Sequence, residues 1–250
     1  MIHSFLLIGQ SNMAGRGIVT EVEPVKDRRI LVMRNGRWQK MFRPVNPDRS
    51  FSGVCLAEKF AQLYAEKYDV QVGLIPCADG GTCLQQWQPG SILLDNAINC
   101  ARLADRTSNV VGILWHQGES DCREERYLTY AQRFLPILAE LRKEPFLKDL
   151  PFLVGGLGDY LPNCEKFPEA ANYLQVNLAL QEIAQTQEKV GFVPADGLTP
   201  NEDNLHFNAP SLYEFGKRYF EIFEAMRDPN QIFVEKSHPD NAIRTAMEAL

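Results

Sequence analysis

The sequence predicts an α/β protein built around a central, mostly parallel β-sheet. Short, continuous apolar runs alternate along the chain with longer stretches of helical periodicity, and turn residues separate the two kinds of segment. Continuous apolar runs are typical of strands that are covered on both faces. Their alternation with helices is typical of βαβ units, in which each helix returns the chain to a parallel strand.

Four apolar runs are the predicted strands, and they cover residues 4–9 (SFLLIG), 70–76 (VQVGLIP), 110–117 (VVGILWHQ) and 151–157 (PFLVGGL). Five amphipathic stretches are the predicted helices, and they cover residues 53–68, 91–106, 123–143, 170–188 and 210–227. The last helix begins with Pro210. Proline lacks an N–H, and this costs nothing in a first turn because an N–H there has no acceptor within the helix. Residues 29–42 contain Asn-Gly between alternating residues, which predicts a hairpin at the edge of the sheet.

Nothing in the 250 residues divides the chain, because there is no internal repeat, low-complexity segment or Pro/Gly/Ser-rich linker. We therefore expect one domain over residues 1–250. Residues 228–250 begin with DPNQIF and end in a short helical pattern. We expect this segment to be a C-terminal appendage.

Composition and charge disfavour several classes of partner. The net charge is -6 and Lys and Arg form no run, so we expect no nucleic acid partner. No apolar stretch approaches the roughly 20 residues that cross a bilayer, and the first residues lack the basic region of a signal peptide. We therefore expect a cytoplasmic protein without a membrane partner; the sequence predicts no particular oligomeric state. Six cysteines without C-x-x-C spacing are predicted to be free thiols: Cys55, Cys77, Cys83, Cys100, Cys122 and Cys164.

Four polar clusters lie where strands end or where the last large helix begins. They are GQSNM (9–13), ADGGT (78–82), HQGESD (116–121) and DNLHFN (203–208). Ligands of open parallel sheets bind beyond the carboxyl ends of the strands. We therefore expect these clusters to meet in one site.

The first and last clusters contain the residue types of nucleophilic catalysis. A serine hydroxyl such as that of Ser11 needs a neighbouring base, and among the histidines we expect His3 and His238 to be incidental because of their positions. Asp203 and His206 are three residues apart, so one turn of chain brings the carboxylate to the imidazole, as the acid of a triad requires. The alternatives are a helix N-cap for Ser11 and a polar surface loop for the other two.

Acyl transfer also needs hydrogen-bond donors aimed at the developing oxyanion. The backbone N–H groups of Gly80 and Gly81, the side-chain amide of Gln117 and the N–H of Ser11 are the candidates. The two glycines could instead form a simple turn.

These blocks resemble those of the SGNH hydrolase superfamily. GQSNMAG, Gly80-Gly81-Thr82 with Trp87, WHQGESD and DNLHFN are similar to the sialate O-acetylesterase and carbohydrate esterase family 6 group, over most of residues 4–220. The resemblance implies a three-layer α/β/α sandwich and a serine esterase that removes O-acetyl groups from a carbohydrate. Its implied site residues are Ser11 as nucleophile, His206 as base, Asp203 as acid, and Ser11, Gly81 and Gln117 as the oxyanion hole. Gln117 stands where the superfamily pattern has Asn.

The second acid and the substrate contacts remain open at this stage. Glu119, in the QGESD block, competes with Asp203 as partner of the histidine, whereas Asp121 is expected to cap a helix that begins near Cys122. Arg16 and Arg34 are candidates to approach a charged substrate such as sialic acid. The other candidate substrate contacts are Gln10, Asn12, Gly80, Thr82, Trp87 and His116.

Three other interpretations compete with this one. An α/β-hydrolase elbow needs G-x-S-x-G, and Met13 occupies the place of its second glycine. A metal hydrolase built from His116, Glu119, Asp121, Asp203 and His206 is disfavoured because zincins carry H-E-x-x-H on a helix. The third is a carbohydrate-binding protein without catalysis, in which Trp87 and Trp115 stack on a sugar. We expect an esterase for an acetylated sugar, oligosaccharide or sialic acid, with no metal and no organic cofactor.

Overall fold

The structure is a computed structural model and describes residues 1–236 and residue 238. Its seven strands form one sheet in the order β3-β2-β4-β1-β5-β6-β7. The strands are β1 (Ile2–Gly9), β2 (Ile30–Arg34), β3 (Arg37–Lys40), β4 (Gln71–Pro76), β5 (Asn109–His116), β6 (Phe152–Gly155) and β7 (Val190–Val193). All neighbouring pairs are parallel except β2 and β3, which form the predicted edge hairpin.

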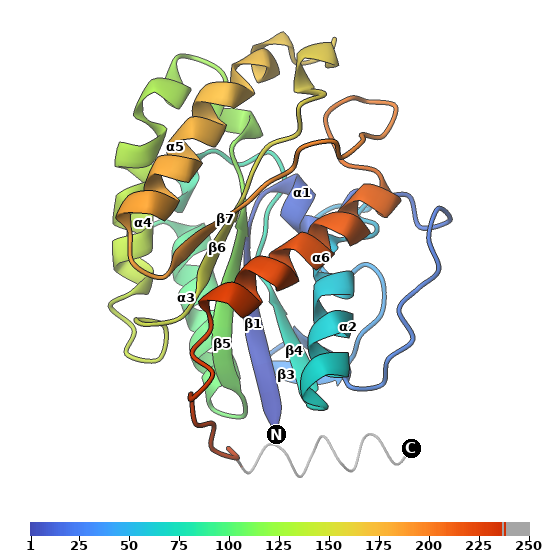
Figure 1. The fold of residues 1–250 in the computed structure, drawn as a ribbon, viewed down its shortest axis with the longest axis vertical. Coiled ribbons are helices and arrows are strands. Elements are labelled where there is room, and N and C mark those ends of the chain that lie inside the picture. Colours follow the sequence, from blue (N-terminus) through green and yellow to red (C-terminus); the bar gives the residue numbers. More distant parts are fainter. Residues whose placement is uncertain (237, 239–250) are drawn as a thin grey trace.

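Helices cover both faces of this sheet (Figure 1). They are α1 (Ser11–Ala14), α2 (Leu56–Tyr68), α3 (Ile92–Asp105), α4 (Tyr130–Leu141), α5 (Tyr173–Thr186) and α6 (Ala209–Met226). Short 3-10 turns are η1 (Leu84–Trp87), η2 (Glu119–Asp121), η3 (Arg126–Thr129), η4 (Leu161–Asn163) and η5 (Pro168–Asn172). Helices α2 and α6 pack together on one face, and α3, α4 and α5 cover the other. The predicted three-layer α/β/α sandwich is confirmed.

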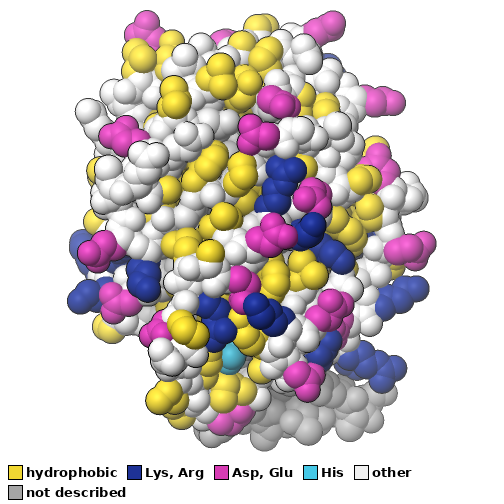
Figure 2. Space-filling view, in the orientation of Figure 1, with side chains coloured by type: hydrophobic (Ala, Val, Ile, Leu, Met, Phe, Trp, Pro, Cys, Tyr) yellow, Lys and Arg dark blue, Asp and Glu magenta, His cyan; other side chains and the backbone are white. Residues whose placement is uncertain are grey.

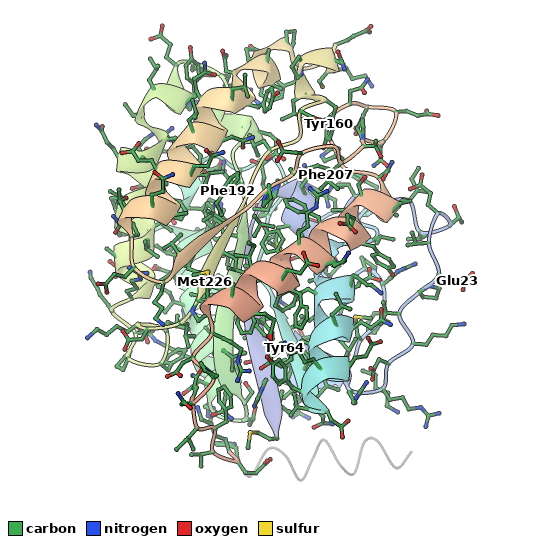
Figure 3. All side chains as sticks on the ribbon, viewed as in Figure 1. Glu23, Tyr64, Tyr160, Phe192, Phe207 and Met226 are labelled. Carbon is green, nitrogen blue, oxygen red and sulfur yellow. The ribbon has the colours of Figure 1, made fainter. Side chains whose placement is uncertain are left out.

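Aromatic side chains fill the two layers of core on either side of the sheet. On one face, the ring of Phe5 from β1 lies 4.7 Å from Phe60 of α2 and 5.3 Å from Phe223 of α6. Tyr64 packs in the same cluster (Figure 3). On the other face, Trp115 from β5 lies 5.3 Å from Phe134 of α4. Burial of each such ring contributes roughly 1.5–3 kcal/mol to the stability of the fold.

Two elements differ from the sequence prediction. The strand β7 was not predicted, because Gly191 interrupts its only three apolar residues. The predicted helix at 123–143 begins only at Tyr130, because Glu124 and Glu125 both have φ of 55°, a left-handed conformation that a helix cannot contain. The 3-10 turn η3 takes the intervening residues.

The end of the chain and the surface bear on three further predictions. Residues 228–236 form neither helix nor strand, while residues 237 and 239–250, with the predicted terminal helical pattern, lie outside the described residues. The single-domain assignment stays a prediction.

All six cysteines are free, as predicted. Within the described chain no helix combines the length and the apolar character that a membrane span requires. Over α2 and α6, acidic and basic side chains are interspersed (Figure 2).

Candidate active site

A glycine turn carries Ser11 from the end of the central strand β1 into the one-turn helix α1. Gly9 has φ of 128°, and a Cβ there would stand 2.1 Å from the carbonyl oxygen of His116. The same oxygen accepts the N–H of Gln10 at 2.8 Å. Only glycine permits this approach, so the turn that carries Ser11 is fixed against the end of β5.

Ser11, His206 and Asp203 form a continuous chain of hydrogen bonds. His206 Nε2 lies 3.0 Å from Ser11 Oγ, and His206 Nδ1 lies 2.7 Å from Asp203 Oδ2. The other carboxylate oxygen, Oδ1, accepts the backbone N–H groups of Leu205 and His206, each at 2.9 Å.

The charge on Asp203 fixes the direction of these bonds. Partial burial opposes its ionisation, but the hydrogen bonds from the His206 side chain and from the two backbone N–H groups lower the pKa of Asp203 to about 2. An ionised carboxylate only accepts, so Nδ1 of His206 carries the proton and Nε2 is free to accept from Ser11. This is the arrangement of a Ser-His-Asp triad.

Glu119, the second candidate acid, lies in a different set of contacts. Its Oε1 accepts from Asn12 Nδ2 at 2.5 Å and lies 3.8 Å from Nδ1 of His116. Its Oε2 is buried and has no hydrogen-bond partner among the described residues. Of the two acids, Asp203 is therefore the one that the structure brings against His206.

The loop after β4 presents a backbone donor to the same site. The N–H of Gly80 donates to Asp48 Oδ2 at 2.8 Å, and Arg16 Nη2 binds the same oxygen at 2.7 Å. None of the described hydrogen bonds uses the N–H of Gly81, which has φ of 78°, or the N–H of Ser11 at the start of α1. These two donors can face an oxyanion.

A pocket of about 290 Å³ opens at these residues. Its lining residues come from six separate segments of the chain: Gln10, Ser11, Arg16, Arg49, Phe51, Gly80, Gly81, Glu119, Ser120, Arg123, Phe167, Leu205 and His206. Ser11, His206 and the free N–H of Gly81 thus share one cavity.

Comparison with known proteins decides the family. Residues 1–225 match the family model described as "Carbohydrate esterase, sialic acid-specific acetylesterase". The chain belongs to this family. It is therefore a carboxylic ester hydrolase, and family membership supports removal of O-acetyl groups from a small-molecule or oligosaccharide substrate.

A curated relative and several solved structures are similar to this chain. A curated relative from Arabidopsis thaliana, a "probable carbohydrate esterase", is 27% identical in an alignment of 238 residues that covers 85% of this chain and 86% of the relative. A solved structure of this Arabidopsis protein has a TM-score of 0.79 at 24% identity, covering 89% of this chain and 98% of that one. The structure of NanS has a TM-score of 0.71 at 18% identity, with 90% and 97% covered. A carbohydrate acetylesterase from Sinorhizobium meliloti has a TM-score of 0.55 at 13% identity, with 90% and 99% covered. At these identities the solved structures show the shared fold.

In this esterase the side-chain amide of Gln117 lies behind the lining of the pocket. Gln117 is fully buried, and its Nε2 lies within hydrogen-bond distance of Asp121 Oδ2 at 2.6 Å, the carbonyl of Thr82 at 3.1 Å and Oε1 of the pocket residue Gln10 at 3.3 Å. Its part in an oxyanion hole stays a prediction. Asp121 caps no helix near Cys122, because its carboxylate accepts from Gln117, the N–H of Leu84 and Arg133.

The predicted substrate contacts divide into two groups. Gln10, Gly80 and Arg16 line the pocket of the esterase, whereas Asn12, Thr82, Trp87, His116 and Arg34 do not. Trp87 is fully buried, donates to Thr82 Oγ1 at 3.0 Å and packs on Trp115 with ring centroids 5.5 Å apart. Both tryptophans are thus core residues, as burying an indole with its N–H satisfied favours.

His116 also belongs to the interior. Its Nε2 lies 3.1 Å from the carbonyl oxygen of Gly156, and burial lowers the pKa of its imidazole. Its ring meets the edge of Phe207, which lies beside Tyr160 (Figure 3). Arg34 stacks over Phe42 and donates to the carbonyl of Pro44, at a distance from the site.

Sequence reasoning missed several pocket residues: Arg49, Phe51, Ser120, Arg123, Phe167 and Leu205. Ser120 and Arg123 lie within or just beyond the QGESD block, so a wider reading of that block contains their signal. Phe51 and Phe167 lie in irregular segments whose sequence carries no periodic pattern. The residues 1–236 and 238 contain no group of three or more His, Cys, Asp or Glu side chains placed to hold a metal ion.

Proposed function

We propose that this carbohydrate esterase works through a Ser11 acyl-enzyme, with His206 as general base and Asp203 as the acid that orients it. The observation that carries the proposal is the pair of hydrogen bonds through His206, 3.0 Å to Ser11 Oγ and 2.7 Å to Asp203 Oδ2. A serine hydroxyl is a weak nucleophile until such a base accepts its proton.

The first half of the reaction transfers the acetyl group to the enzyme. Nε2 of His206 takes the proton of Ser11 as Oγ bonds to the acetyl carbonyl carbon, and Asp203 stabilises the imidazolium. The carbonyl oxygen becomes an oxyanion that the N–H groups of Ser11 and Gly81 bind. The C–O bond to the sugar then breaks, and the sugar oxygen takes the proton from Nε2.

The second half releases acetate. A water molecule gives a proton to Nε2 of His206 while its oxygen bonds to the acetyl carbon of the acylated Ser11. The same two backbone donors stabilise the second oxyanion. When the bond to Oγ breaks, acetate leaves and Nε2 returns its proton to Ser11.

An acidic sugar is the substrate that the charges of the pocket favour. Arg16 is paired with Asp48 at 2.7 Å and Arg49 with Asp79 at 2.8 Å. Arg123 lies 4.7 Å over the ring of Phe167, and its guanidinium takes part in no described hydrogen bond or ion pair. A guanidinium whose donors are free fits a carboxylate in two-point contact. We therefore extend the proposal to an O-acetylated acidic sugar such as sialic acid.

The deciding experiment compares wild type with Ser11→Ala for acetate release from an activated acetyl ester at neutral pH. We expect kcat to fall by about 10³-fold or more, the loss that follows removal of a nucleophile. Ser120→Ala is the matched control, since Ser120 lines the same pocket and has no role in the proposed chemistry. Equal rates in wild type and Ser11→Ala would refute the serine mechanism and favour sugar binding as the role of this pocket.

A further inference from the structure

One buried side chain links the nucleophile turn to the loop of the base. Asn12 follows Ser11 directly in α1 and is 1% exposed. Its Oδ1 accepts the N–H of Phe207 at 3.1 Å, and its Nδ2 donates to the carbonyl of Leu205 at 3.3 Å. Leu205 and Phe207 are the two neighbours of His206. A single side-chain amide therefore hydrogen-bonds to the backbone on both sides of His206.

Glu119 fixes the orientation of that amide. The second hydrogen on Nδ2 of Asn12 meets Oε1 of Glu119 at 2.5 Å. A carboxylate oxygen accepts from the NH2 group, so the oxygen of the amide is turned to the N–H of Phe207. Glu119 is 2% exposed. None of its described hydrogen bonds goes to His206.

From these contacts we infer that Asn12 and Glu119 act as a positioning pair that sets the distance between Ser11 and His206. Glu119 acts on the reaction through Asn12, and it is not the acid of the histidine. This inference rests on the proposed serine mechanism.

The site needs such a device because neither segment is held by regular structure of its own. Helix α1 has four residues, and the loop that carries His206 contains no helix or strand. Its isolated bridge, between Pro200 and Phe207, lies within the loop, and Asn201 Nδ2 ties the loop to the carbonyl of Arg16 at 2.9 Å. Reacting groups that shift by about 1 Å can lose about 10²-fold in rate. The amide of Asn12 spans the two segments directly beside the reacting atoms.

The test exchanges donor and acceptor across the bond of 2.5 Å between Asn12 and Glu119. Asn12→Asp puts two oxygens against each other, so we expect kcat to fall by about 10²-fold. KM should stay unchanged because Asn12 does not line the pocket. The double variant Asn12→Asp, Glu119→Gln restores a donor opposite an acceptor and should recover at least about tenfold of the lost kcat. Asn163→Asp, on an exposed 3-10 turn, is the control for added charge.

Glu119→Gln alone separates positioning from acid catalysis. The amide oxygen of the replacement still accepts from Asn12, although more weakly than a carboxylate does. We expect kcat to fall by no more than about tenfold, with the pH profile of kcat unmoved. Loss of a triad acid leaves the histidine in the wrong tautomer and lowers kcat by about 10⁴-fold.

Each outcome has one meaning. A loss near 10⁴-fold in Glu119→Gln, full activity in Asn12→Asp, or no recovery in the double variant would each overturn the inference. Melting temperatures of all variants are measured in parallel, and if Asn12→Asp does not fold, the Glu119→Gln result decides. A wild type whose turnover does not depend on Ser11 refutes the proposed function itself, which the comparison with Ser11→Ala reveals separately.

Discussion

Replacing Asp203 by Asn changes one hydrogen bond of the site and preserves the loop around it. Oδ1 of Asp203 accepts two backbone N–H groups, each at 2.9 Å. In Asp203→Asn the amide oxygen keeps this place, because an NH2 group there would face two donors. The amide nitrogen then stands where Oδ2 accepts from His206 Nδ1 at 2.7 Å. Nδ1 must become an acceptor, so the ring proton moves to Nε2.

A proton on Nε2 removes the acceptor that lies 3.0 Å from Ser11 Oγ. A triad with its histidine in the wrong tautomer loses about 10⁴-fold in kcat, which corresponds to about 5.4 kcal/mol of transition-state stabilisation. We expect this loss in acetate release at pH 7, with KM unchanged because Asp203 does not line the pocket. Glu202→Gln, which neutralises the exposed neighbouring carboxylate, is the matched control. A kcat of Asp203→Asn within tenfold of wild type would refute the assignment of Asp203 as the acid.

Three further predictions follow from the packing and charge of the site. In Gly80→Ala the new Cβ would stand 2.4 Å from Arg16 Nη2 and displace the loop after β4, which carries the N–H of Gly81. We therefore expect kcat to fall by about 10²-fold. Gly36→Ala, whose Cβ would meet nothing closer than 3.8 Å, should leave kinetics unchanged. Arg123→Gln should raise KM about tenfold for an O-acetylated acidic sugar, equal to about 1.4 kcal/mol, and leave KM for a neutral acetylated sugar unchanged; equal effects on both substrates would contradict the carboxylate contact. Hydrogen bonding lowers the pKa of Asp203 from 3.8 to about 2 in the folded protein, so its contribution to stability is complete above pH 3.8 and is lost as pH falls through about 2. Because Asp203 is partly screened by solvent, we expect the free energy of unfolding in urea to be only about 1 kcal/mol higher for wild type than for Asp203→Asn at pH 6. A difference between the two proteins that does not shrink toward pH 2 would contradict this.

The fold was predictable from sequence to the extent that its signals are local. The strands β1, β4, β5 and β6 are continuous apolar runs, and the helices between them keep their periodicity over three or more turns. The strand β7 does not stand out because Gly191 interrupts its three apolar residues, whereas the four residues of β6 lie within the longer run 151–157. The helix α4 was predicted too long because amphipathic spacing continues through residues whose backbone turns left-handed.

For the site too, the features that were predictable are those with a local sequence signal. Ser11 at a strand end, and Asp203 three residues before His206, are local patterns with a direct chemical meaning. The direction in which a side chain points is not local. Trp87 and Gln117 stand in the expected blocks but face the interior. Thr82 offers the indole of Trp87 an acceptor there, and Asp121 of η2 and Tyr130 of α4 bind the amide of Gln117. The pocket residues Phe51 and Phe167 reach the site from irregular loops, which only tertiary packing places.

The position of the site follows from the order of the strands. Strand β1 lies between β4 and β5, so the connection from β4 to β5 crosses over the strand that leads into Ser11. Chains that leave a sheet in opposite directions open a crevice at the carboxyl ends of the strands where they part. Gly9 lies in this crevice, where its carbonyl accepts the N–H of Asp79 at 3.0 Å while the next N–H, of Gln10, donates to His116 at 2.8 Å. The turn that carries Ser11 is thus hydrogen-bonded to the loop after β4 on one side and to the end of β5 on the other. His206 comes from outside the sheet, on the loop before α6, and so it is the partner whose placement the strand order alone does not set. Asn12 binds the backbone on both sides of His206, beyond the ends of the strands, and so it places the residue that the sheet does not.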